Sequence, residues 1–312
     1  MQSLIIAFNA VMPLFIYIGL GHYIRRIQAI SEKTLVEMNA LTFKFFFPIN
    51  LMVNVINTEL PEHFRYDALF FTIIICLLLA TLFAIVIMVF EPDNTKRGVM
   101  LQGAFRSNFI LFGLPISTYL LNGRDMLLTT VLIAIIVPLN NILSVLAMSI
   151  FSNHKMTLRQ VIHSVITNPM TIGTLIGFVI ALLNIPIPNF LMQSLMGISR
   201  MITPLALIIM GAMFNFKTVH SRLKPLSITL ILKLVISPVI GITAAILFGF
   251  KGELLIPMVI LFSAPTAVSS YSVAISMGGD GELANQIVIF STAFSLITMM
   301  IIIGSLNYLG FL

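Results

Sequence analysis

Apolar runs of about 20 residues recur along almost the whole chain, and they constrain its fold more than any other feature. A helix needs roughly 20 apolar residues to cross a hydrocarbon core of about 30 Å. The runs predict ten such helices, at 4–23, 35–57, 67–90, 97–121, 126–151, 161–183, 190–213, 226–249, 254–277 and 285–308. Only 9% of the 312 residues are charged, against about 25% in a soluble domain. The sequence therefore predicts an all-α membrane protein without a separate soluble catalytic or DNA-binding domain.

The distribution of basic residues predicts how these spans are oriented. Loops after the odd-numbered spans hold ten Lys and Arg residues, and the opposite loops hold three. The ten are Arg25, Arg26, Lys33, Lys96, Arg97, Lys155, Arg159, Lys217, Arg222 and Lys224, and the three are Arg65, Arg124 and Lys251. Because basic loops stay in the cytoplasm, we expect a multi-pass protein of the cell inner (plasma) membrane with both termini outside. Topology thus accounts for the net charge of +6, and no nucleic-acid partner is expected.

Residues that match at a constant offset along the chain predict an internal repeat. A shift of 156 residues matches four pairs: Pro13 with Pro169, Gly21 with Gly177, Lys44 with Arg200, and Pro48 with Pro204. A shift of 150 places 111–115 on 261–265, so that Pro115 falls on Pro265 in the fourth span of each half. Each half has five spans, an odd number, so the second half must be inverted. We expect inverted repeats at 1–151 and 161–312, joined by a short cytoplasmic loop at 152–160, with the fourth and ninth helices broken at Pro115 and Pro265.

Four cations fall inside the predicted spans, namely Lys44, Arg106, Arg200 and Lys233, whereas none of the eleven acidic residues lies deep in a span. Each central cation costs roughly 2.5 to 3.5 kcal/mol, so several of them require water, backbone carbonyls or an anionic guest. The imbalance predicts a small carboxylate-bearing anion. Arg106 could bind a carboxylate through two hydrogen bonds. Lys44 and Arg200 could face one cavity or bind carbonyls at a helix break, and Lys233 is interpreted as snorkelling to the cytoplasmic surface.

Uncharged polar residues near the two expected breaks are further candidates for the binding site. They are Asn108 before the first break and Ser263, Thr266, Ser269, Ser270 and Tyr271 around Pro265. Asn108 is the strongest of them, because an amide is harder to accommodate in lipid than a hydroxyl. Asn50, Asn54, Asn140 and Asn141 are expected to form hydrogen bonds with neighbouring helices.

In their order and spacing, several stretches of the chain resemble the auxin efflux carrier family, which includes bacterial malonate-type transporters and the plant PIN carriers. These stretches are 106–116, 168–169, 203–207, 211–212, 264–268, 278–280 and 291–292. The resemblance implies a five-plus-five inverted repeat with crossed helices four and nine, like the elevator fold of the NhaA antiporter and the bile-acid symporters. It implies a scaffold of spans 1, 2, 6 and 7 and a transport bundle of spans 3–5 and 8–10. It also implies that Asn108 and Pro265 lie at the substrate site, and that the protein is a homodimer.

The chain departs from its relatives at two points. The loop at 152–160 is short, unlike the long cytoplasmic loop of plant PIN carriers. The spans also lack the carboxylates that bind coupling ions in relatives of this fold, so coupling to H⁺, coupling to Na⁺ and uncoupled transport all stay open. No cofactor or metal is expected, because Cys76 is alone and the histidines lack metal-ligand spacing.

These features favour a secondary transporter that moves a small organic anion by an elevator-type alternating-access mechanism. A mono- or dicarboxylate such as malonate, or an auxin-like acid, would suit a positive site. An anion channel or a uniporter is the alternative, since it shares the positive interior. An intramembrane enzyme would need a buried acid pair, a His-Glu metal motif or a Ser-His arrangement, and the spans show none.

Overall fold

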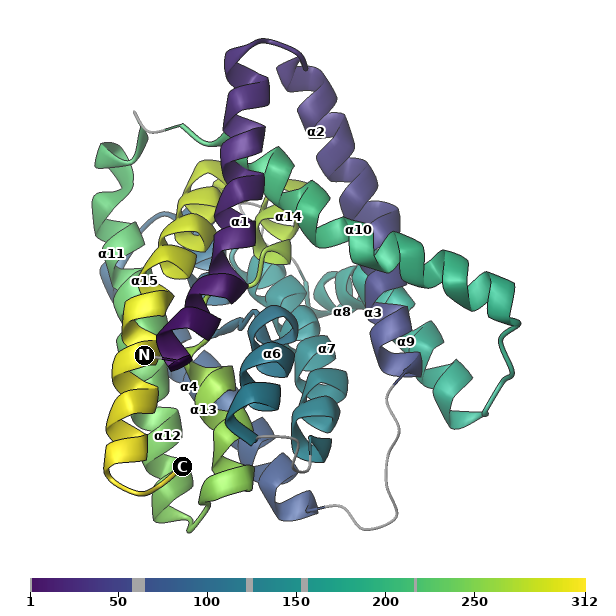
Figure 1. Cartoon of the computed structure of the whole chain (residues 1–312). Coiled ribbons are helices and arrows are strands. Elements are labelled where there is room, and N and C mark those ends of the chain that lie inside the picture. The colour runs from purple at the N-terminus through teal and green to yellow at the C-terminus, as the bar shows by residue number, and fades with distance from the viewer. Residues whose placement is uncertain (1, 58–64, 122–125, 153–156, 216–217) are drawn as a thin grey trace.

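The computed structural model describes residues 2–57, 65–121, 126–152, 157–215 and 218–312 (Figure 1). The elements of the first half are α1 (Gln2–Arg26), α2 (Glu32–Leu41), η1 (Thr42–Phe46), α3 (Phe47–Ile56), α4 (Tyr66–Phe90), α5 (Asn94–Phe105), α6 (Phe109–Leu121) and α7 (Leu127–Ile150). Those of the second half are α8 (Leu158–Ile166), α9 (Pro169–Leu182), α10 (Asn189–Met213), η3 (His220–Arg222), α11 (Leu223–Ile231), η4 (Leu232–Ile236), α12 (Ser237–Leu247), η5 (Gly252–Leu254), α13 (Leu255–Ser263), α14 (Ser269–Ser276) and α15 (Gly281–Tyr308). Arg124, Lys155 and Lys217, which entered the topology count, lie outside the described residues.

Within the described residues, six helical stretches are long and apolar enough to cross a membrane. They are Glu32–Ile56, Tyr66–Phe90, Leu127–Ile150, Asn189–Met213, His220–Leu247 and Gly281–Tyr308. The bent pair of α8 and α9, which meet at 59°, makes a seventh if it forms one span. The all-helical membrane class is confirmed. The predicted spans 97–121 and 254–277 are each divided into two shorter helices, and the count of ten spans stays a prediction.

Proline explains why two of the long stretches contain a π-helical turn. Pro48 follows η1 and Pro238 follows η4, and neither can donate to the carbonyl four residues earlier because proline has no N–H. The residue before each proline instead donates to a carbonyl five residues back, Phe47 to Thr42 and Ser237 to Leu232. Both stretches therefore continue past the proline, with a locally widened turn.

The helices fall into two groups (Figure 1). In the first, which we call the panel, α10 packs against α1, α2, η1 and α3, and α3 packs against α9. In the second, which we call the bundle, α5 packs against α4, α7, α11, η4, α14 and α15, and α13 packs against α6 and α12. The two groups meet where α1 contacts α6 and α15, where α7 contacts α3 and α9, and where α14 contacts α2, η1 and α10.

Glycines let two helix pairs of the panel approach to backbone contact. A Cβ on Gly21 of α1 would overlap the carbonyl oxygen of Ile208 on α10, and one on Gly177 of α9 would lie 2.9 Å from that of Met52 on α3. Gly177 follows Gly21 by 156 residues, and Ile208 follows Met52 by the same 156. The two contacts are therefore related by the shift seen in the sequence. The inverted orientation of the halves stays a prediction.

Candidate functional site

Two helices are each interrupted by a short linker, and the two linkers contact each other. The first break lies between α5 and α6 at residues 106–108, and the second lies between α13 and α14 at residues 264–268. The two linkers run antiparallel, since Asn108 N donates to the Pro265 carbonyl at 2.8 Å and Ser107 forms a bridge with Thr266. Each linker thus satisfies backbone groups that the other break has freed, which lipid could not do. We call this arrangement the crossing.

The structure corrects the predicted position of the first break. Pro265 lies in the second break, but Pro115 lies inside α6 with its side chain exposed, seven residues beyond Asn108. A proline within a membrane helix removes one hydrogen bond, here to the carbonyl of Leu111, and such helices tolerate that loss. The break instead falls on a polar run, Arg106 to Asn108, whose groups bond across the crossing. The match of 111–115 with 261–265 therefore does not align equivalent positions.

Thr266 fixes the crossing to its neighbours. Its Oγ1 donates to the Gly103 carbonyl of α5 at 2.7 Å, and its N–H donates to Ser291 Oγ of α15 at 3.1 Å. The side chain is fully buried and does not line the cavity described next. Its position favours a structural role over contact with substrate.

A cavity of about 60 Å³ lies beside the crossing. It takes its walls from the crossing, from the bundle helix α7 and from the panel. The polar lining residues are Arg106, Ser107, Asn108, Ser269, Asn140, Asn141, Asn50 and Thr203. Arg106, Asn108 and Ser269 are thus predicted site residues that the structure brings together.

Arg106 is held between two helices of the bundle. Its Nη2 donates to Asn141 Oδ1 of α7, and to Ser269 Oγ at the start of α14 at 2.6 Å. The side chain is 3% exposed. Its second terminal nitrogen, Nη1, is buried without a hydrogen-bond partner among the described residues. Arg106 is therefore positioned by one nitrogen and has the other to offer to a guest.

The cavity lining is rich in donors that have no acceptor. Asn108 Nδ2, Asn141 Nδ2 and Ser107 Oγ are buried and lack partners among the described residues, as does Arg106 Nη1. The Asn141 amide orientation is determined, because its oxygen accepts the bond from Arg106. Leaving a buried donor unsatisfied costs about 1–3 kcal/mol, and more for a charged group. In the described part of the chain Glu91 is the one buried acidic side chain, and it lies at the end of α4. An acceptor-rich, anionic guest would satisfy these donors.

Three of the four predicted intramembrane cations do not lie where they were expected. Lys44 and Arg200 are exposed and lie outside the cavity. Ser199 bonds to Asn50 across the α3–α10 contact, so Arg200, about 100° further round the helix, points away from that contact. Lys44 shares its outward side of η1 with the exposed Phe45. Lys233 does not snorkel to the surface, because it is only 1% exposed.

Three residues that line the cavity, Asn50, Asn140 and Asn141, were predicted only to form hydrogen bonds between helices. Asn50 Nδ2 donates to Ser199 Oγ at 2.8 Å, and Asn141 accepts from Arg106, so both form the expected contacts between helices. The sequence signal for Asn141 is the adjacent pair Asn140-Asn141 in the middle of an otherwise apolar run.

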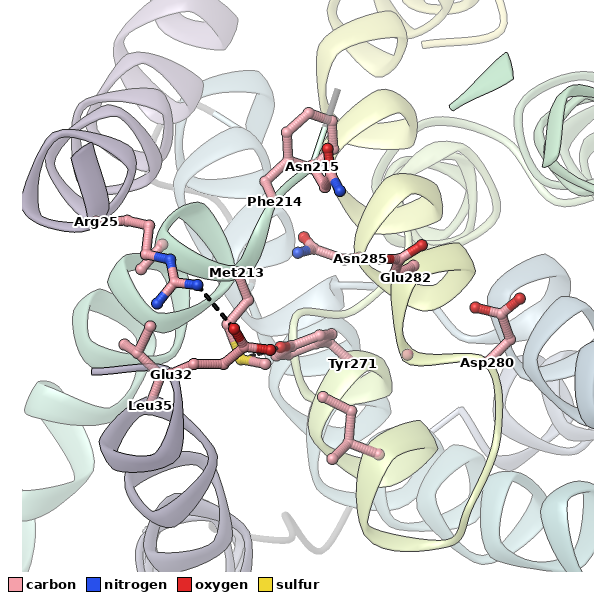
Figure 2. A pocket seen from close by; sticks show the side chains of 13 residues that line it. Arg25, Glu32, Leu35, Met213, Phe214, Asn215, Tyr271, Asp280, Glu282 and Asn285 are labelled. Atoms are coloured by element: carbon pink, nitrogen blue, oxygen red, sulfur yellow. Dashed lines mark hydrogen bonds and ion pairs between the residues drawn. The ribbon is translucent and has the colours of Figure 1, made fainter. Parts of the chain in front are cut away.

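Two larger cavities flank the crossing. One of about 510 Å³ is lined by Arg25 and Glu32 on the panel side and by Asn285 and Glu282 of α15 (Figure 2). The other, of about 680 Å³, includes Val55 and Ile56. Glu32 and Ile56 are the two ends of one continuous helical stretch, and the small cavity is lined by Phe47, Asn50 and Leu51 between them. The three cavities therefore follow one another along the panel.

Two hydrogen bonds join α14 to the panel beside the 510 Å³ cavity. Tyr271 Oη donates to Met213 Sδ of α10 at 2.8 Å, and Figure 2 shows the two side chains close together among the residues that line the cavity. Ser272 Oγ donates to Asn39 Oδ1 of α2, also at 2.8 Å. Both donors belong to α14, the helix that begins at Ser269.

The corrected position of Pro115 gives a test. We expect Pro115→Ala to leave the function of the site within about twofold of wild type, because the side chain is exposed and outside the cavity. The new N–H can bond to the Leu111 carbonyl, so the unfolding temperature should stay the same or rise. Binding of small carboxylates and thermal unfolding of the purified protein measure the two effects. Loss of binding in a folded Pro115→Ala variant would return Pro115 to the site.

Residues 6–303 of the chain match the model of a protein family that is described as membrane transport protein. No curated protein matches the chain.

Proposed function

The chain belongs to the membrane transport protein family, that of the auxin efflux carriers, and we propose that it is a secondary transporter of a small organic anion. The family consists of transporters, which agrees with the expectation that the protein is not an enzyme. One observation carries the proposal: four buried groups that line the cavity at the crossing, all able to donate a hydrogen bond, have no partner among the described residues, and none of the described residues that line it is a carboxylate.

A carboxylate fits these donors chemically. Its two oxygens offer about four acceptor sites, to which Arg106 Nη1 and the amides of Asn108 and Asn141 can donate. A hydrogen bond to a charged partner is roughly twice as strong as one between neutral groups. The N-terminus of α14 begins at Ser269 beside Arg106, and its partial positive charge favours an anion as well.

The sizes of the cavities support a carrier rather than an open channel. The cavity at the crossing, at about 60 Å³, is much smaller than the flanking cavities of about 510 and 680 Å³, so the route between them is narrowest there. Bundle and panel both line it, so a displacement of one against the other would widen the cavity and connect it to one flanking cavity at a time. We propose that the bundle moves past the panel in this way, as an elevator.

Other expectations from the sequence remain proposals. A coupling ion, if one is used, would bind carbonyl, amide or hydroxyl oxygens, because no described group of three or more His, Cys, Asp or Glu residues could hold a metal ion. The homodimer and the placement of both termini outside likewise rest on the resemblance and on the charge of the loops.

Counterflow in proteoliposomes tests the function. Vesicles containing the purified protein are loaded with one unlabelled mono- or dicarboxylate at a time, and uptake of the labelled acid is followed with and without ion gradients. We expect saturable exchange with at least one acid, because loading from either side should fill the same site.

Two results would contradict this. A monodisperse protein that exchanges no acid would show that the donor cluster does not bind anions. Single-channel currents far above carrier turnover rates would show an anion channel instead.

A further inference from the structure

Lys233 is a buried cation that the proposed binding site does not use. It lies in the π-helical turn η4, within the bundle, and its side chain is 1% exposed. The structure records no hydrogen bond or ion pair between its ammonium and any described residue. An amine kept in this position at the cost of several kcal/mol of desolvation needs a reason other than snorkelling.

Contacts on either side place Lys233 close to the crossing. One turn before it, the Thr229 methyl lies 3.1 Å from where a Cβ of Gly103 would be, two residues before the end of α5. One turn after it, Ser237 Oγ donates to the Phe262 carbonyl, one residue before the end of α13, at 3.3 Å. Lys233 therefore lies between the last turns of the two helices that end at the crossing.

The surroundings of Lys233 offer no opposite charge. The elements packed against η4 are α5, α11, α12, α13 and α15. Their described residues form no ion pair with Lys233. Among the described residues, the interior of the bundle thus contains two cations, Arg106 and Lys233, without a carboxylate paired to either, and an anionic guest could balance their charge.

We infer that Lys233 determines specificity by favouring dicarboxylates over monocarboxylates at the crossing. This inference rests on the proposed anion site. Lys233 does not line the cavity, so it acts on the guest through its electric field. The energy of that interaction is proportional to the charge of the guest. By Coulomb's law, a unit charge on the order of 12 Å from the guest, at an effective dielectric constant of about 20, would change affinity about tenfold for each charge that the guest carries.

A pair of ligands matched in shape tests this. Malonate carries two negative charges at neutral pH, and its monoamide, malonamate, carries one. Their affinities for the full-length wild-type protein and for Lys233→Met are measured by calorimetry. We expect Lys233→Met to weaken malonate binding about 100-fold and malonamate binding about tenfold, so that the ratio of affinities falls about tenfold. Lys233→Arg should restore the ratio. Lys224→Met removes the same charge from an exposed position on α11 and should leave it unchanged.

A second variant covers the case in which Lys233→Met does not fold. Lys233→Gln also removes the charge but keeps a polar side chain of similar length in the bundle, so the affinity ratio should fall as in Lys233→Met. If Lys233 only supported the fold, its replacement would weaken the binding of malonate and malonamate equally. An unchanged ratio of the two affinities in the folded variants would therefore overturn the inference while leaving the anion site intact. A wild-type protein that binds neither ligand would overturn the inference about dicarboxylates, whereas the anion site itself is overturned only if counterflow detects no exchange with any acid.

Discussion

Arg106→Ala is expected to abolish exchange of organic anions, with affinity for the anion falling by about 100-fold or more. Truncating one member of a buried, hydrogen-bonded charge pair costs about 2–5 kcal/mol, and Arg106 is the one cation among the described residues that line the cavity at the crossing. The substitution also removes the hydrogen-bond donor to Asn141 Oδ1 and Ser269 Oγ, so these two side chains are no longer held in place beside the cavity. Counterflow and calorimetry with the acid that the wild type exchanges measure the loss.

Arg200→Ala is the matched control. It removes the same side chain from an exposed position of α10 outside the cavity, so exchange should persist. Arg106→Lys keeps the charge but loses the planar guanidinium, which can donate two parallel hydrogen bonds to a carboxylate. We therefore expect its affinity for the anion to lie between those of Arg106→Ala and the wild type. Normal exchange by a folded Arg106→Ala protein would show that Arg106 does not belong to the binding site.

The largest effect on folding is expected from Gly21→Val. A Cβ at this position overlaps the Ile208 carbonyl and lies 2.8 Å from the backbone nitrogen of Ala212, so neither neighbour can give way by changing rotamer. The α1–α10 contact would have to separate along its length, and close packing is what holds helices together in a membrane. We expect almost no monodisperse protein in size-exclusion chromatography of detergent-solubilised membranes.

Gly19→Val distinguishes this clash from the general effect of valine in a helix. Gly19 is also in α1, and a Cβ there would meet no atom within 4 Å. This variant should therefore be recovered in the same amount and with the same elution profile as the wild type. If Gly21→Val were recovered equally well, the close approach of α1 and α10 would not be needed for folding.

The helical class and much of the site could be predicted because each follows from local sequence. Long apolar runs determine where helices can lie in a membrane, and a charged residue inside such a run must find a partner, which identified Arg106. Asn108 and Ser269 were found because they stand near the broken helices. The contact between the two linkers at the crossing could be predicted only from the family resemblance, because no local sequence pattern indicates which two linkers meet.

What could not be predicted depends on side-chain direction and on contacts distant in sequence. Lys44 and Arg200 lie at mid-helix, as expected, but which way they point is decided by the packing of α3 on α10 through Asn50 and Ser199. Pro115 was over-interpreted because proline alone does not break a membrane helix. The burial of Lys233 depends on the neighbours of η4, which come from both halves of the chain.

The geometry of the crossing also has a consequence for how the charge of the transported substrate could change in evolution. Two helices end there with their carbonyls, at Phe105 and Ser263, and two begin there with their N–H groups, at Phe109 and Ser269. The negative and positive poles of the backbone are thus present in equal number, and the main chain prefers neither sign of ligand. The preference resides in a few replaceable side chains. A descendant with carboxylates in place of Arg106 and Lys233 would keep the same backbone and select cations, so mutation at two positions could reverse the charge of what is carried while the architecture is inherited intact.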